Sequence, residues 1–282
     1  MGDARAVSGR TWGVAAAGLG LIAVLEGLNI AGVGGEALEA WVSNAPLTLV
    51  TIYAASIVIW AALQFSAGVP IRRQWLFIGL GVLAFGLGNV VWTLYAAQGL
   101  EPFPSLADIG YSLLYPLAAY GIWSALLSFR RMFDIKTPLA VGAAIAAVAT
   151  GTLYFSLFQT IAADTETSVL GKVLSIGYPI GDMWLLLLPA IAIAIVASRM
   201  AGGRIAWPWY ATCVGLVLIS AADSLYAVQS WNGTYQSGSY VDIIWCVGFT
   251  AIAVGASVLL DVQKAGGTKS AAERSSEGGE QR

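Results

Sequence analysis

Residues 169–198, VLGKVLSIGYPIGDMWLLLLPAIAIAIVAS, decide the fold class because they form an apolar run long enough to cross a membrane. A helix of about 20 apolar residues spans the roughly 30 Å of hydrocarbon in a bilayer. The chain of 282 residues is 58% hydrophobic and 11% charged, a far more apolar composition than that of ordinary soluble domains. The sequence therefore predicts an all-α integral membrane protein.

Eight runs of this kind follow one another along the chain, so we expect eight transmembrane helices. They cover residues 11–33, 46–67, 75–97, 105–129, 138–162, 169–198, 206–230 and 239–262. The remaining segment, 263–282, is rich in Gly, Ser, Glu and Ala and has no apolar period. Because such a composition favours disorder, the sequence predicts a membrane domain over 1–262 followed by a disordered cytoplasmic tail.

Basic residues lie almost entirely on one side of the predicted helices. That side carries Arg5, Arg10, Arg72, Arg73, Arg130, Arg131, Lys136, Arg199, Arg204 and four basic residues of the tail. The opposite loops carry Glu36, Glu39, Glu101, Asp164, Glu166 and a single basic residue, Lys172. Because cytoplasmic loops retain lysine and arginine, we expect both termini on the cytoplasmic side of a bacterial cell membrane. A cleaved signal peptide is disfavoured, since 11–33 is too long and contains Glu26.

The chain contains no histidine, and this absence removes several classes of chemistry. Bis-histidine haem, the usual zinc sites and nucleophilic triads built on histidine all need that side chain. We therefore expect no metal, no cofactor and no enzymatic activity. The expected partners are the lipid bilayer, a small ligand and a cytoplasmic signalling protein, with no nucleic acid; a homodimer is left open.

Two motifs, PSLADIGYSLLYP at 104–116 and GSYVDIIWCVGF at 238–249, share a register. The offset of 134 residues relates one to the other. It pairs Asn89 with Asp223, Ser105 with Ser239, Asp108 with Asp242, Tyr111 with Trp245, Tyr115 with Phe249 and Gly121 with Gly255. We therefore predict two parallel four-helix repeats, over about 11–129 and 138–262.

Helix capping explains part of this motif without any function. The spacing of Ser105 to Asp108 and of Ser239 to Asp242 fits a capping box, in which the acid bonds back to the backbone amide at the start of the helix. Capping does not explain the aromatic residues three and seven positions later on the same helical face.

Three acidic residues, Glu26, Asp182 and Asp223, are expected inside the hydrocarbon, where a charge is costly and usually functional. Hydrogen bonding within the protein, protonation, hydration or a bound cation could each compensate them. Prolines at Pro116 and Pro179 would widen the space around them. We therefore predict an outward-facing acidic–aromatic pocket. Its candidate ligand-binding residues are Glu26, Asn89, Asp108, Tyr111, Tyr115, Tyr178, Asp182, Asp223, Tyr226, Asp242 and Trp245.

Four short motifs in this order resemble a known kind of membrane region. They are PSLADIGYSLLYP (104–116), SIGYPIGDMWLLL (175–187), AADSLYA (221–227) and SYVDIIW (239–245). The chain is similar there to the polytopic N-terminal sensory regions of bacterial diguanylate cyclases and phosphodiesterases. The resemblance implies a membrane input module whose ligand is generally unknown. No catalytic domain follows in this sequence, so cyclic-dinucleotide chemistry is not implied.

These observations favour a non-enzymatic membrane sensor or ligand-binding module that signals to a cytoplasmic partner. A small-solute or proton-coupled transporter is the alternative, because carboxyl groups within the membrane can carry protons. An enzyme using paired aspartates as acid and base, and a purely structural scaffold, are the remaining hypotheses.

Overall fold

The computed structural model describes residues 7–280, with the backbone alone at 37, 201–203 and 266–280. The described part is all-helical, and eight of its helical stretches are long and apolar enough to cross a membrane. These spans are Gly9–Ile30, Leu38–Leu63, Pro70–Ala96, Ala107–Phe129, Lys136–Ala163, Val169–Ala197, Arg204–Trp231 and Tyr240–Ala265. The all-helical fold and the eight apolar helices predicted from the sequence are therefore confirmed.

The first four spans are continuous helices. They are α1 (Gly9–Ile30), α2 (Gly35–Leu63), α3 (Pro70–Ala96) and α4 (Ala107–Phe129). The Ser8 side chain accepts the backbone N–H of Thr11 at the start of α1, and Pro70 occupies the first turn of α3, where no N–H is needed.

The next two spans each contain a π-helical segment. The fifth consists of α5 (Lys136–Leu153), η1 (Tyr154–Phe158) and α6 (Gln159–Ala163), and the sixth of α7 (Val169–Ile180), η2 (Gly181–Leu187) and α8 (Leu188–Ala197). A short 3₁₀ turn, η3 (Ala201–Ala206), leads to α9 (Trp207–Trp231) and then to α10 (Tyr240–Glu280). Such π-helical segments are uncommon and often mark functional sites.

The predicted start of the second helix at residue 46 is wrong, because α2 begins at Gly35. Pro46 lies inside this helix rather than at its first turn. Only the short turn Ala31–Gly34 separates α1 from α2, and Gly34 takes a positive φ of 90° there. Glycine is favoured in this left-handed backbone conformation, so the chain reverses early and the next helix starts eleven residues sooner than expected.

The tail predicted to be disordered follows α10 without a break in the backbone. That helix continues to Glu280, and residues 281 and 282 lie outside the described part. The segment contains alanine, glutamate, lysine and arginine, which are good helix formers, and no proline to stop the helix. The boundary at residue 262 between a membrane domain and a tail stays a prediction.

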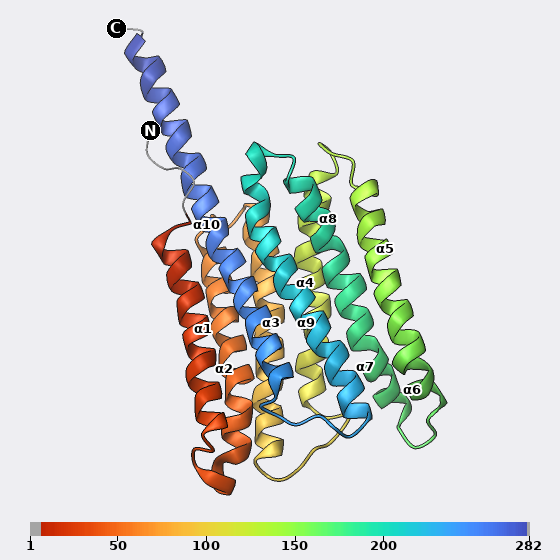
Figure 1. Ribbon diagram of the computed structural model, residues 1–282. Coiled ribbons are helices and arrows are strands. Elements are labelled where there is room, and N and C mark those ends of the chain that lie inside the picture. The colour runs from red at the N-terminus through yellow and green to blue at the C-terminus, as the bar shows by residue number, and fades with distance from the viewer. Residues whose placement is uncertain (1–6, 281–282) are drawn as a thin grey trace.

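The helices form one bundle in which α10 occupies a central position (Figure 1). It contacts α9, α2 and α1, and the chain of contacts continues from α2 to α3, from α3 to α4, and from α4 to α8 and η2. Two helices lie outside this ring: α1 rests on α2 and α10, and α5 rests on α8 and η2. Both α1 and α5 therefore lie at the periphery of the bundle.

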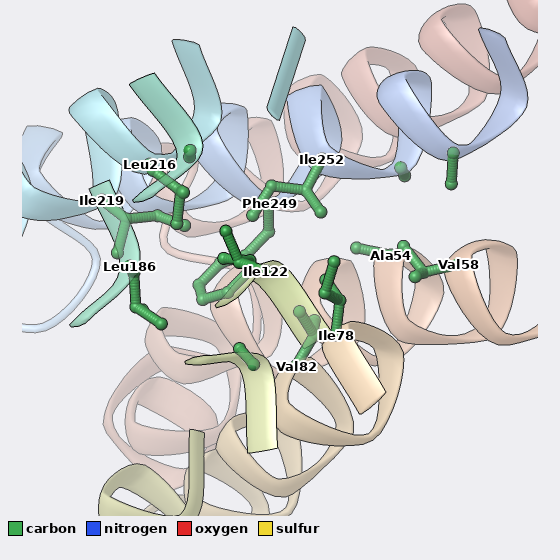
Figure 2. Close-up of a cluster of buried hydrophobic side chains, with 14 of the residues drawn as sticks. Ala54, Val58, Ile78, Val82, Ile122, Leu186, Leu216, Ile219, Phe249 and Ile252 are labelled. Carbon is green, nitrogen blue, oxygen red and sulfur yellow. The ribbon is translucent and has the colours of Figure 1, made fainter. Parts of the chain in front are cut away.

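The centre of the bundle is an apolar core drawn from both halves (Figure 2). Side chains from α2, α3, α4, η2, α9 and α10 meet there. The labelled members are Ala54, Val58, Ile78, Val82, Ile122, Leu186, Leu216, Ile219, Phe249 and Ile252. This core holds the two halves together and fixes the polar side chains described next.

Both ends of the described chain lie at the same face of the bundle (Figure 1). The loops at 64–69, 130–135 and 198–206 join helices at that face, which we call the termini face, and among the described side chains it gathers every basic residue except Lys172. The face at the other end, the distal face, carries the loops at 31–34, 97–106, 164–168 and 232–239.

Candidate functional site

Two aspartates, Asp108 and Asp242, mark the distal ends of α4 and α10, and we call them the rim aspartates. Both are buried, and each accepts three hydrogen bonds. The backbone N–H and the hydroxyl of Ser105 donate to Oδ2 of Asp108 at 2.6 and 3.2 Å. The N–H groups of Gly238 and Ser239 donate to Oδ2 of Asp242 at 2.9 and 3.0 Å. The capping role predicted for both acids is therefore present in the structure.

A second pair of contacts also recurs at the same spacing. The Tyr111 hydroxyl on α4 donates to Oδ1 of Asn89 on α3 at 3.1 Å. The Trp245 indole on α10 donates to Oδ1 of Asp223 on α9 at 2.8 Å. In both cases the donor follows the acceptor by 22 residues, and the two pairs are 134 residues apart.

The α4 tyrosines connect the first half of the chain to the sixth span. The third donor to Asp108 is the Tyr178 hydroxyl on α7, at 2.7 Å. The Tyr115 hydroxyl lies 3.2 Å from both the Tyr178 carbonyl oxygen and Oδ1 of Asp182. The rings of these two tyrosines stack with centroids 6.0 Å apart. Polar contacts therefore run from the rim at Asp108 to Asp182 inside the bundle.

Asp182 and Asp223 form what we call the inner pair. Asp182 lies in η2 and is 2% exposed, whereas Asp223 lies in α9 and is half-buried. Their carboxyl groups are within hydrogen-bonding reach of each other. Oδ2 of Asp182 is buried and has no hydrogen-bond partner among the described residues. The structure thus brings together two acids that the sequence places 41 positions apart.

The remaining predicted residues lie near the distal end of α10. The Tyr226 ring lies 5.5 Å from the Trp245 ring. Glu26 on α1 is buried, accepts an Asn29 amide hydrogen bond at 3.4 Å, and is close enough to Asp242 for their charges to interact. All of the predicted site residues therefore lie in or beside one polar and aromatic network.

Sequence reasoning missed Tyr235, which lies in the loop before α10. Its hydroxyl donates to Oδ1 of Asp242 at 2.9 Å, and its ring meets Tyr226 edge to face at 4.7 Å. Burial, with the nearby Asp242 charge, raises the pKa of the Tyr235 phenol, so it remains a donor at ordinary pH. The available signal was its position four residues before Ser239, the first residue of the predicted capping box.

The π-helical segment η2 is flanked by two prolines that change the local hydrogen bonding. Pro179 lies in the last turn of α7 next to the site, and Pro189 lies in the first turn of α8. Because Pro189 has no N–H, the Leu185 carbonyl loses its usual helical donor. The Trp123 indole on α4 donates to that carbonyl at 3.1 Å. The irregular backbone that carries Asp182 is therefore supported from the neighbouring helix.

Two surface hollows lie elsewhere. One of about 610 Å³ adjoins the loop before α4 and includes Glu101 and Ser105. The other, of about 390 Å³, lies at the termini face beside Arg130 and Arg131. The inner pair lines neither hollow, and its residues contact one another directly.

Comparison with known proteins found no similar protein. No known family matches the sequence. No curated protein and no solved structure matches the chain either.

Proposed function

We propose that this chain is a multi-pass membrane sensor, non-enzymatic, whose site is the acidic and aromatic network in the distal half of the bundle. One observation carries the proposal: the network joins α4, α7, η2, α9 and α10 through contacts to the rim aspartates and the inner pair. A change of charge or occupancy at the inner pair would alter the contacts of all these elements together. Coupling between a site and a distant face requires such a shared, switchable arrangement.

The orientation follows from charge. Among the described side chains the termini face gathers every basic residue except Lys172, so by the preference of cytoplasmic loops for lysine and arginine we place it in the cytoplasm of a bacterial cell. The distal face would then look outward. The rim aspartates lie at its edge, and Asp182 lies near the middle of its span. A signal would travel along α8, α9 and α10 toward a cytoplasmic partner.

We also propose that the two halves are parallel repeats. The recurring bonds of Tyr111 and Trp245 support this, as do the two similar caps. Trp75 and Trp209 are themselves 134 positions apart, and their rings touch at a centroid distance of 5.3 Å. Contact between equivalent residues is expected next to a two-fold axis. The site would then lie between two related halves.

The test compares the full chain in lipid nanodiscs with a double variant, Asp182→Asn with Asp223→Asn, by hydrogen–deuterium exchange. We expect altered exchange both near the site and in the loops 130–135 and 198–206 of the termini face. The matched control is Asp164→Asn, which removes an acid from a distal loop. Changes confined to the distal half would refute the sensor proposal, because no signal would reach the cytoplasmic face.

A transporter remains the second candidate because of η2. Transporter sites commonly lie near the middle of the membrane beside irregular helical backbone, and Asp182 lies in a π-helical segment near the middle of its span. Proteoliposomes loaded with a pH-sensitive dye would decide between the two. Proton or solute flux that the double variant abolishes would favour transport over sensing.

A further inference from the structure

The inner pair differs from the rim aspartates in its supply of hydrogen-bond donors. Each rim carboxyl accepts three protein donors. Asp182 accepts one, the Tyr115 hydroxyl, which the Tyr178 carbonyl shares, and Asp223 accepts one from Trp245. Oδ2 of Asp182 has no partner among the described residues. The two carboxyl groups of the inner pair have four oxygens and only two protein donors. Because they contact each other, a hydrogen on one of them is needed to form a bond between them.

No basic side chain in the sequence can neutralise this pair from the surrounding spans. Lysine and arginine are absent from 107–129, 173–198 and 205–263. Lys172, the one basic residue of α7, lies at the distal start of that helix, where its ammonium donates to the backbone carbonyl of Asp164. Arg10 forms an ion pair with Asp261, 2.5 Å away, near the termini face. The described residues contain no group of three or more His, Cys, Asp or Glu side chains arranged to hold a metal ion. The missing positive charge must therefore come from outside the chain.

Packing limits the size of whatever supplies that charge. Gly181, next to Asp182, lies so close to Tyr115 that an added methyl group would be 2.6 Å from its ring. The same tyrosine stacks on Tyr178. The occupant must be very small, and a hydrogen on one carboxyl that donates to the other meets both requirements.

We propose that Asp182 and Asp223 hold one exchangeable proton between their carboxyl groups, and that this proton is what the network responds to. The inference rests on the proposed sensor only in taking this pair as the sensed site. With the proton bound, one carboxyl donates to the other and draws η2 and α9 together. Without it, two like charges face each other and repel. External acidity would then control the contact between η2 and α9.

Other titratable groups lie around the inner pair, but none of them has its combination of a contacting carboxyl group and too few hydrogen-bond donors. Phenols stay neutral at ordinary pH, and the rim carboxyls have their own three donors. Of the remaining elements packed on η2, α8 has no titratable residue, and α5 has only Lys136, at its opposite end. Tyr115 from α4, Tyr178 from α7 and Tyr226 from α9 face the pair, whereas Asp108, Tyr111 and Asp242 interact with these tyrosines rather than with the pair.

Infrared difference spectroscopy on the full chain in nanodiscs tests the proposal, because a protonated carboxyl has a C=O stretching band that a carboxylate lacks. We expect this band at neutral pH, its loss in alkaline buffer, and its loss in both Asp182→Asn and Asp223→Asn. The asparagine amide replaces the bridging hydrogen, so these variants should keep their helix content. Asp108→Asn should keep the band. A wild type without the band, or a band removed by Asp108→Asn instead, would overturn the proposal.

Two further arms separate the alternatives. The spectra are recorded in sodium and in choline buffers, and a band that sodium abolishes would overturn the proton in favour of a sodium ion. The hydrogen-exchange experiment is run on the same variants. A band that behaves as expected, without exchange changes at the termini face, would leave the proton site standing and refute the sensor.

Discussion

The close contact between α9 and α10 at Gly215 predicts how far an added methyl group would push these two helices apart. A Cβ added at Gly215 would lie 2.5 Å from the Gly248 carbonyl oxygen and 2.8 Å from Cγ1 of Ile252. Ordinary contact at such positions begins at 3.4 Å, so the two helices would have to separate by about 3.4 − 2.5 = 0.9 Å. The nearest atom belongs to the backbone and cannot rotate away.

We expect Gly215→Ala to lower the free energy of unfolding by about 1–3 kcal/mol, the range for overpacking a well-packed core. At Gly81, which lies 134 positions earlier, an added Cβ would lie 3.0 Å from the backbone at Leu114 and Ala118, a smaller overlap of about 3.4 − 3.0 = 0.4 Å. Gly81→Ala should therefore cost less. A displaced α10 would also stretch the 2.8 Å bond from Trp245 to Asp223.

The assay is unfolding in mixed micelles, titrated with a denaturing detergent and followed by circular dichroism. Gly20→Ala is the matched control, since its Cβ would meet nothing within 4 Å. Alanine is the better helix former by up to about 1 kcal/mol, so this variant should be unchanged or more stable. If Gly215→Ala proves as stable as Gly20→Ala, the close approach of α9 and α10 is wrong.

Three further predictions concern individual hydrogen bonds. Asp261→Asn should speed hydrogen exchange in the first turns of α1, because Asp261 accepts bonds from Ser8, Arg10 and Thr11; exchange mass spectrometry checks this against Asp134→Asn, an acid in an exposed loop. Trp123→Phe should lower the unfolding free energy by about 1–3 kcal/mol in the same detergent titration, since it leaves the Leu185 carbonyl without its donor. Bonds from the Thr167 hydroxyl and amide lower the pKa of Asp164, so its stabilising effect should be present above about pH 4 and disappear as pH falls through the lowered pKa; the stability difference from Asp164→Asn, measured against pH, tests this.

The sequence predicted the positions of the helices better than the contacts between them. Apolar runs are a direct consequence of bilayer thickness, and they placed the spans within a few residues, apart from the start of α2. That helix begins early because the glycines after α1 permit a tight turn, whereas the prediction took Pro46 as a helix start.

Local spacing also predicted the caps at the rim aspartates, because a capping box is confined to four consecutive residues. The contact of Asp182 with Asp223 has no such local signature. It depends on how α9 packs against the sixth span and on the π-helical turn at Gly181–Leu187, which rotates the side chains within it. Neither packing nor an extra residue in a turn can be read from hydrophobic periodicity. Tyr235 was missed because loops carry no period at all.

The length of α10 has a mechanical consequence. Its 41 residues extend about 60 Å at 1.5 Å per residue, roughly twice the hydrocarbon thickness of a bilayer. Its first turn carries Asp242, and its far end extends beyond the other helices (Figure 1). A rigid rod pivoting at its distal end by about 5° would swing its other tip by roughly 5 Å, given that length. On the proposed sensor function, the helix would act as a lever arm, turning a small adjustment beside the rim into a displacement large enough for another protein to detect.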